Sequence, residues 1–141
     1  MKKIFLMLFA FSILFANDIE DLLSASYNGD LKIVKKLIKK GLKVDTKSPY
    51  NDATPLMLAS LNNKLNVVKY LIKHGANVNA KFNLGATPLI IATTQGHTKI
   101  VKYLIKHGAK IDLKDDYGRT ALMYAADKGY KDIIKILKKH D

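Results

Sequence analysis

Residues Phe82–Lys114 read FNLGATPLIIATTQGHTKIVKYLIKHGAKIDLK, and this stretch decides the fold. After a short polar opening, Thr-Pro-Leu at residues 87–89 predicts a helix start, because a threonine hydroxyl can cap a helix and proline fits the first helical position. This short apolar helix is expected to end near Gly96, and a second, longer helix is expected to end at Gly108. The apolar face of the second helix consists of Ile100, Val101, Leu104 and Ile105.

The same landmarks return at intervals of 33 residues. Thr-Pro-Leu begins at Thr54 and Thr87, and the related Thr-Ala-Leu begins at Thr120. Lys-His-Gly-Ala begins at Lys73 and again at Lys106. Neither helix of such a unit can cover its own apolar face, so neighbouring units must stack against it. A fixed period of this size, with two helices in each unit, predicts a stacked solenoid.

These motifs resemble ankyrin repeats, and the resemblance runs from about Asp18 to Asp141. It implies an all-α fold class: a solenoid of four helix-turn-helix repeats with β-turn fingers. It also implies a protein-binding module rather than an enzyme. The family usually has a histidine after Thr-Pro-Leu, but Met57, Ile90 and Met123 stand at that position in this chain. Apolar packing is expected to replace the polar bridge that the histidine makes.

The N-terminal segment is of a different kind. Lys2 and Lys3 precede the apolar run Ile4–Phe15, and the small residue Ala16 stands before the polar Asn17. This pattern predicts a signal peptide, residues 1–16, cleaved after Ala16. The run is shorter than the roughly 20 residues that a membrane-spanning helix needs. We therefore expect an exported, periplasmic bacterial protein, with an uncleaved anchor as the alternative.

Residues 17–141 are expected to form one ankyrin repeat domain. The four repeats are predicted at about 17–47, 49–81, 82–114 and 115–141. The first repeat lacks Thr-Pro-Leu, and its opening acids Asp18, Glu20 and Asp21 favour a helix start there. It should cap one end of the stack, and the polar C-terminus should cap the other.

Two local departures from the repeat pattern are expected to change the backbone. One extra residue near Ser48–Tyr50 should give the first finger its own shape. Asn63 stands where later repeats have Gly96 and Gly129. Since asparagine tolerates the left-handed conformation better than most residues, the turn should be preserved.

Composition excludes several classes of chemistry. The chain has 24 Lys and Arg against 12 Asp and Glu, a formal net charge of +12, and it has no cysteine. Disulfides, thiol catalysis and thiolate metal sites are therefore excluded. No Ser/His/Asp grouping, paired carboxylates or phosphate-binding glycine loop stands out from the repeat pattern. We predict no catalytic residues.

Lysines recur in pairs four residues apart on the face opposite the apolar one. Stacking would align them into two basic rows, which either bind an anionic membrane or other polyanion or form a solvated helix face. Arg119 is the only arginine, and phosphate and base recognition favour arginine, so nucleic acid is not an expected partner. The pairs are Lys35/Lys39, Lys69/Lys73, Lys102/Lys106 and Lys135/Lys139.

Histidines are the second candidate constellation. His74, His107 and His140 occupy equivalent places and should form a column, but neighbouring helices lie about 8–10 Å apart, too far for adjacent rings to share a metal easily. We predict no metal site and no cofactor, with contacts to helix-end carbonyls as the main interpretation. A haem- or metal-handling accessory role for a peroxide-defence enzyme such as catalase is an alternative, implied by the resemblance to small exported bacterial ankyrin proteins.

Acidic residues near the last finger could suggest a calcium loop, but its regular ligand spacing and final glutamate are missing. Asp112, Asp115 and Asp116 are instead expected to stabilise the finger through hydrogen bonds.

The resemblance places the binding site on the finger tips and the exposed side of each first helix. Tyr50, Leu84 and Tyr117 are the expected anchors, because exposed aromatic and apolar side chains often anchor interfaces. We expect a monomer that binds a protein partner there. The candidate residues are Tyr50, Asn51, Leu61, Asn62, Lys81, Asn83, Leu84, Thr94, Gln95, Lys114, Asp116, Tyr117, Arg119, Asp127 and Lys128.

Overall fold

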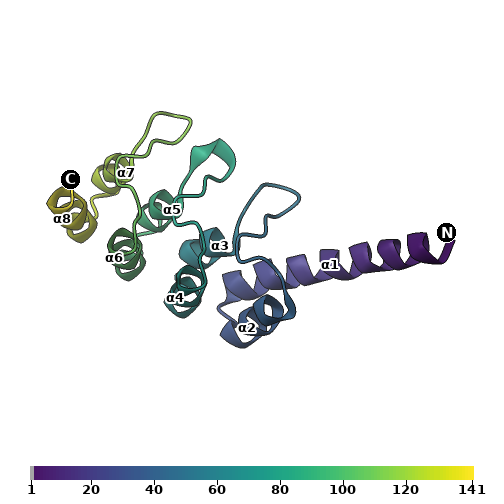
Figure 1. The fold of residues 1–141 in the computed structure, drawn as a ribbon. Helices are drawn as coiled ribbons and strands as arrows, with labels where there is room; N and C mark the ends of the chain where they lie inside the picture. Colours follow the sequence, from purple (N-terminus) through teal and green to yellow (C-terminus); the bar gives the residue numbers. More distant parts are fainter. Residues whose placement is uncertain (1) are drawn as a thin grey trace.

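The chain folds into a row of helix pairs with a projecting finger between one pair and the next (Figure 1). A computed structural model describes the backbone of residues 2–141 and the side chains of residues 2–7 and 16–141. The described elements, in chain order, are α1 (Lys2–Asn28), α2 (Leu31–Lys40), α3 (Pro55–Leu61), α4 (Leu65–Lys73), the 3-10 turn η1 (Asn83–Gly85), α5 (Pro88–Thr94), α6 (Thr98–Lys106), α7 (Ala121–Lys128) and α8 (Lys131–Lys139).

The helices form two layers. The inner helices α1, α3, α5 and α7 contact one another in series, and the outer helices α2, α4, α6 and α8 do the same. The first, second and third fingers, residues 41–54, 74–87 and 107–120, project on the side away from the outer helices (Figure 1). The predicted all-α stack of paired helices is confirmed.

The threonine that opens each regular repeat caps its inner helix. The hydroxyls of Thr54, Thr87 and Thr120 accept hydrogen bonds of 3.4, 3.3 and 3.4 Å from the backbone amide three residues later. Pro55 and Pro88 occupy the first helical position, where a missing N–H costs no hydrogen bond. The capping threonine therefore sets where α3, α5 and α7 begin, and proline supports the start of α3 and α5.

Left-handed residues make the turn between the two helices of a pair. Asn63 has φ 59°, close to the 71° of Gly96 and the 68° of Gly129. The predicted substitution of asparagine for glycine in this turn is confirmed.

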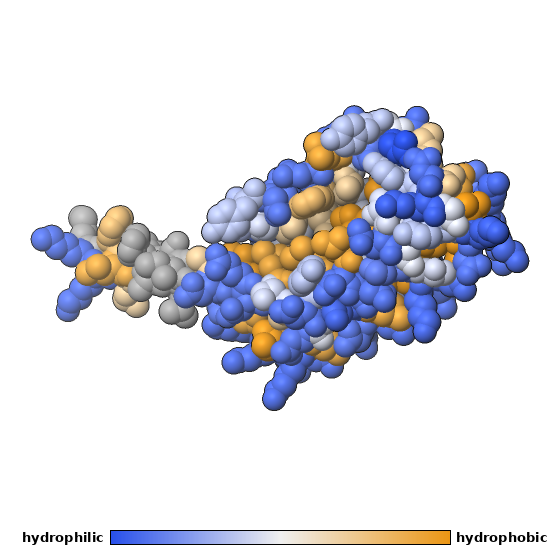
Figure 2. Space-filling model, turned by 180° about the vertical axis from the view of Figure 1, so that it is seen from behind, coloured by the Kyte–Doolittle hydropathy of each residue, from blue (hydrophilic) through white to orange (hydrophobic). Residues whose placement is uncertain are grey.

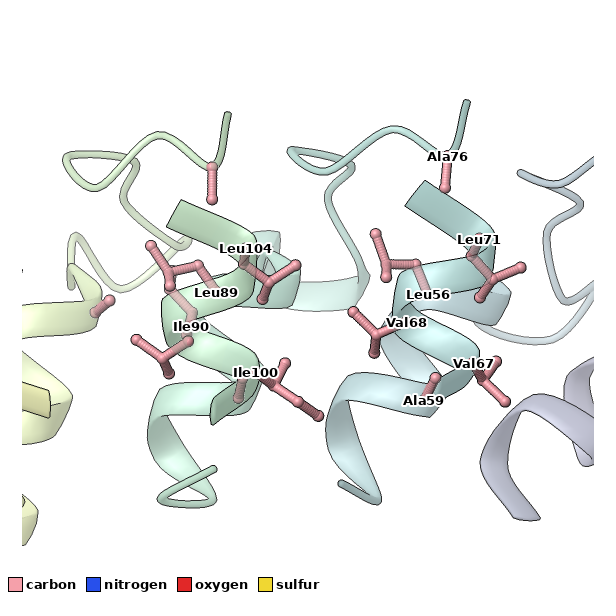
Figure 3. Close-up of a cluster of buried hydrophobic side chains, with 14 of the residues drawn as sticks. Leu56, Ala59, Val67, Val68, Leu71, Ala76, Leu89, Ile90, Ile100 and Leu104 are labelled. Atoms are coloured by element: carbon pink, nitrogen blue, oxygen red, sulfur yellow. The ribbon is translucent and has the colours of Figure 1, made fainter. Parts of the chain in front are cut away.

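The core runs through the whole stack, between the layers and between neighbouring pairs. Leucines and branched residues from successive pairs meet there, including Leu71 and Leu104, neither of which is exposed (Figure 3). Ala59, Ala92 and Ala125 also have no exposed surface. A small side chain at this repeated position lets the inner helices pack closely, which explains why alanine recurs there.

The residue that replaces the family's usual histidine is buried in some repeats and exposed in another, depending on the repeat's place in the stack. Met57 and Ile90 are buried, as the expectation of apolar packing requires. Met123 is 45% exposed, so the expectation is wrong for the last repeat. The physical reason is that, in the described structure, no further helix pair packs against α7 and α8 to cover the side chain.

α1 begins earlier than the sequence suggested. It runs without interruption from Lys2 to Asn28, so the helix start expected at Asp18 is wrong. No glycine or proline lies between these residues to end a helix. The predicted signal peptide falls partly outside the described residues, which leave out Met1 and the side chains of residues 8–15. Within the described part of the chain, no helix combines the length and apolarity needed to cross a membrane.

Short backbone hydrogen bonds close the fingers. Ser48 N–H donates to Ala53 O at 2.8 Å, whereas Phe82 N–H donates to Ala86 O at 2.9 Å, across one residue fewer. The extra residue of the first finger therefore lies inside its turn, as predicted. The second finger contains the 3-10 turn η1 rather than a simple β-turn.

Candidate functional site

Three large side chains stand out from the tips of consecutive fingers. Tyr50 is 81% exposed, Leu84 57% and Tyr117 68%. They come from the first, second and third fingers, which project side by side along the stack (Figure 1). The fold thus places the three expected anchors on one edge of the molecule, with little packing to occupy them.

Leu84 is held in an unusual backbone conformation. Its φ is +63°, in the left-handed region that a bulky L-residue rarely adopts. The corresponding tip residues Asn51 and Tyr117 do not have positive φ. Such strain persists only where the surroundings enforce it, and it is concentrated at functional sites.

Neighbouring fingers are tied to each other. The amide of Asp116 donates to the carbonyl of Leu84 at 2.9 Å, and Lys81 Nζ donates to the carbonyl of Lys114 at 3.2 Å. Both bonds join the second finger to the third. These two fingers therefore present their tips as one unit, and part of the hydrogen-bonding capacity of Lys81 is used within the protein.

Further candidates lie at the C-terminal ends of the inner helices, whose N-terminal ends follow directly from the fingers. Seen from behind, hydrophobic surface gathers in a band between the fingers and the hydrophilic surface of the helices below (Figure 2). Leu61 is the exposed large apolar side chain of α3. The other candidates at these ends are polar: Asn62, Thr94, Gln95, Asp127 and Lys128.

Several of these polar candidates bond within the protein. Asn62 Nδ2 donates to the carbonyl of Tyr27 at 2.8 Å, and Thr94 Oγ1 donates to the carbonyl of Ile91 at 2.8 Å. In the first finger, Asn51 Oδ1 accepts from the amide of Ala53 at 3.2 Å. Asn83 and Gln95 are exposed, with no side-chain hydrogen bond among the described contacts, so they remain available to a partner.

Sequence reasoning missed Tyr27 as a surface residue. Its side chain is exposed on α1. Its backbone carbonyl accepts the hydrogen bond from Asn62, the residue that follows Leu61. Gly29 and Asn63 are corresponding turn residues, so Tyr27 and Leu61 stand in the same register, each two residues before the turn. This shared register could have identified Tyr27 from the sequence, but the first repeat is too degenerate for the alignment to be evident.

Arg119 and Asp127 pair with each other rather than standing free. The Arg119 guanidinium forms an ion pair with the Asp127 carboxylate and lies 4.6 Å from the centre of the Tyr124 ring. Its Nε atom is buried without a hydrogen-bond partner among the described residues. These contacts join the base of the third finger to α7.

Asp115 organises the third finger. Its Oδ1 accepts hydrogen bonds of 2.9 Å from the amides of Tyr117 and Arg119, and its Oδ2 accepts one from the Tyr124 hydroxyl. The expectation that acids stabilise this finger is confirmed for Asp115. Asp112 and Asp116 are exposed, and among the described contacts their carboxylates make no such bonds.

The ionisation of Asp115 and Tyr124 reflects their shared hydrogen bond. Burial would raise the pKa of the Asp115 carboxyl, but hydrogen bonds from Tyr124, Arg119 and Tyr117 lower it below the ordinary 3.8. Donation to Asp115, together with burial, raises the pKa of the Tyr124 hydroxyl above the ordinary 10.0. The carboxylate is therefore stabilised as an anion and the phenol as a neutral donor.

The outer helices carry the predicted lysine rows. All eight lysines of the four pairs are exposed on α2, α4, α6 and α8. The predicted arrangement of the rows is confirmed, and it lies on the layer opposite the fingers (Figure 1).

The predicted histidine column is also confirmed. His74, His107 and His140 each follow the last residue of an outer helix. His74 Nδ1 lies 2.8 Å from the carbonyl of Tyr70, as expected for a helix-end contact. Within the described residues, no group of three His, Cys, Asp or Glu side chains could hold a metal ion.

His97 has a separate position between two helix pairs. Its Nε2 lies 3.0 Å from the carbonyl of Leu61, at the end of α3. This contact joins the second pair to the third and gives the ring a structural role.

The comparison with known families agrees with this architecture. The family model for ankyrin repeats, in three copies, matches residues 22–115 and also residues 81–141. No curated protein matches the chain. Ankyrin repeats generally mediate protein–protein interactions and are typically non-catalytic. Since the matched residues cover most of the sequence and the helix pairs stack in series, the chain belongs to the ankyrin repeat family.

Proposed function

We propose that this protein binds a protein partner through its finger tips and inner-helix ends, without catalysis. The observation that carries the proposal is the exposure of Tyr50, Leu84 and Tyr117 on three consecutive fingers. Large apolar and aromatic side chains commonly supply most of the binding energy of an interface. Figure 2 also shows a band of hydrophobic surface bordered by hydrophilic surface on one side of the molecule.

Rigidity supports this proposal. The second and third fingers are tied through Leu84 and Asp116, and Asp115 fixes the backbone of the third finger. A preformed surface loses less conformational freedom on binding, so more of the contact energy appears as affinity. The partner would then meet anchors that already stand in their bound positions.

The proposed setting follows from the N-terminal sequence. Lys2 and Lys3, the apolar run and Ala16 support export to the periplasm, with an accessory or scaffold role there as a monomer. Cell fractionation with N-terminal sequencing of the recovered protein tests this. Recovery from the periplasm with Asn17 as the first residue supports export and cleavage. Recovery from the cytosol with an intact N-terminus contradicts both.

The binding site is tested by capturing partners from periplasmic extract with the purified protein. The test variant changes Tyr50, Leu84 and Tyr117 to alanine. The control variant changes Ile33 and Met123, which are also exposed and apolar but lie at the two ends of the stack. We expect the tip variant to lose a partner that the wild type and the control both retain. Equal capture by all three proteins would contradict the assignment of the binding site.

A further inference from the structure

The outer layer has a strongly one-sided charge. Its four helices carry a lysine on nearly every turn, and Asp132 is their one acidic residue. Among the described ion pairs, only Lys40 with Asp18, at 2.6 Å, neutralises a lysine of these helices. The remaining outer lysines keep their charge uncompensated by an ion pair in the described structure. We call this exposed side of α2, α4, α6 and α8 the outer face.

Shallow grooves with basic rims separate the outer helices. The groove between α4 and α6 has a volume of about 330 Å³ and is lined by Lys69, Lys73, Ile72, Tyr103, Tyr70 and His107. The next groove, between α6 and α8, also measures about 330 Å³ and is lined by Lys102, Lys106, Ile136, Lys139 and His140. Each groove therefore combines ammonium groups with apolar or aromatic side chains.

Aromatic rings position some of the ammonium groups. Lys35 Nζ lies 5.6 Å from the centre of the Tyr70 ring, and Lys69 Nζ lies 5.8 Å from that of Tyr103. Each contact joins one outer helix to the next. An ammonium over a ring face is attracted by the π-electrons, so these lysines are held along the face while their charge stays exposed.

We propose that the outer face docks on a membrane surface rich in anionic phospholipids, with headgroup phosphates entering the two grooves. Charge complementarity supports this partner, since juxtamembrane lysines are attracted to anionic lipid surfaces. Attraction to an anionic lipid surface does not require the bidentate phosphate contacts that arginine makes, so the point charges of lysine are sufficient. Nucleic acid fits less well because Arg119, the single arginine, lies at the finger side. The finger tips stay free on the opposite side (Figure 1), so this inference does not depend on the proposed function.

The test measures binding of the full chain to sedimented vesicles of phosphatidylcholine, with or without roughly 30% phosphatidylglycerol. The neutral vesicles report any contribution of the apolar N-terminal segment. One variant changes Lys69, Lys102 and Lys106 to glutamine. The charge-matched control changes Lys43, Lys47 and Lys110, which are exposed in the finger segments, to glutamine. A third protein changes the three outer lysines to arginine, and circular dichroism verifies folding.

We expect binding to anionic vesicles that weakens steeply with added salt, because exposed charges are screened beyond about 8 Å at physiological ionic strength. The outer glutamine variant should lose at least about tenfold in partition coefficient. The control should lose much less, and the arginine variant should keep binding. Equal losses in the outer glutamine variant and the control would overturn the proposal. So would equal wild-type binding to the two vesicle types, or binding to heparin without binding to anionic vesicles.

Discussion

The carbonyl of Leu84 accepts a 2.9 Å hydrogen bond from the amide of Asp116, joining the second finger to the third. Leu84 makes this contact with a left-handed backbone, at φ +63°. Its side chain is exposed, so burial of that side chain does not offset the backbone strain. The arrangement instead holds a large apolar side chain in solvent beside the neighbouring tip, as a preformed anchor would require.

Replacing Leu84 with asparagine should therefore change stability and partner binding in opposite directions. Asparagine accepts the left-handed region, so the free energy of unfolding should rise by about 1 kcal/mol while partner binding weakens. Urea unfolding and a binding titration measure the two effects. Tyr117→Asn is the matched control, because Tyr117 lacks a positive φ and its replacement should weaken binding without raising stability. A loss of stability in Leu84→Asn would contradict the strain argument.

Asn79 joins the second and third fingers near their bases. Its Oδ1 accepts from the amide of Lys110 at 2.8 Å, and its Nδ2 donates to the carbonyl of Gly108 at 3.0 Å. Asn79→Ala should lower the free energy of unfolding by about 1–3 kcal/mol, since it removes two hydrogen bonds between repeats. Chemical denaturation measures the change.

Asp112 provides the control for Asn79, because it occupies the same register in the third finger, and the described structure contains no further finger for it to contact. Asp112→Ala should change the free energy of unfolding by less than about 0.5 kcal/mol. Similar losses in the two variants would show that the contacts between repeats are not the cause.

Alanine substitution at equivalent positions should lower the free energy of unfolding more in the interior of the stack than at its end. Ile90 is 3% exposed, whereas Met123, in the same register, is 45% exposed. Ile90→Ala should lower the free energy of unfolding by about 2–5 kcal/mol through lost burial and a cavity. Met123→Ala should cost less than about 1 kcal/mol under the same denaturant conditions. A Met123 cost equal to that of Ile90 would mean that something covers the end of the stack.

Asp115 should make stability depend on pH in the acidic range. Hydrogen bonds lower its folded-state pKa below 3.8, so its contribution is fully present above that value and is lost as pH falls through the lowered pKa. Urea unfolding as a function of pH measures this loss. Asp115→Asn should be less stable than the wild type near neutral pH, and the difference should shrink in acid. A difference that is independent of pH would contradict this assignment.

The repeat architecture could be predicted because its determinants are local. Thr54 and Thr87 cap helices with their own hydroxyls, and Asn63 supplies the left-handed turn by itself. These features depend on residues close in sequence, so a motif that recurs in register was enough to place them. The exposed tips were predictable for the same reason, since each finger is a short insertion between two helices.

Features that depend on neighbours or on stack position could not be predicted in this way. The exposure of Met123 arises because no further helix pair packs against α7 and α8 in the described structure. The role of Leu84 depends on its contact with Asp116 in another finger. The continuous helix through Asp18 arises because residues upstream permit it, although the local acids favour a start there. The Arg119–Asp127 pair likewise brings together two candidates that the sequence treated separately.

The most direct measurement of the central claim is hydrogen–deuterium exchange of the protein with and without its captured partner. Protection on binding should appear in the tip segments of the three fingers, residues 46–53, 82–86 and 115–119, and at the C-terminal ends of α3, α5 and α7. Exchange in the outer helices α2, α4, α6 and α8 should be unchanged. Protection confined to the outer helices, with the fingers unaffected, would contradict the finger-based account.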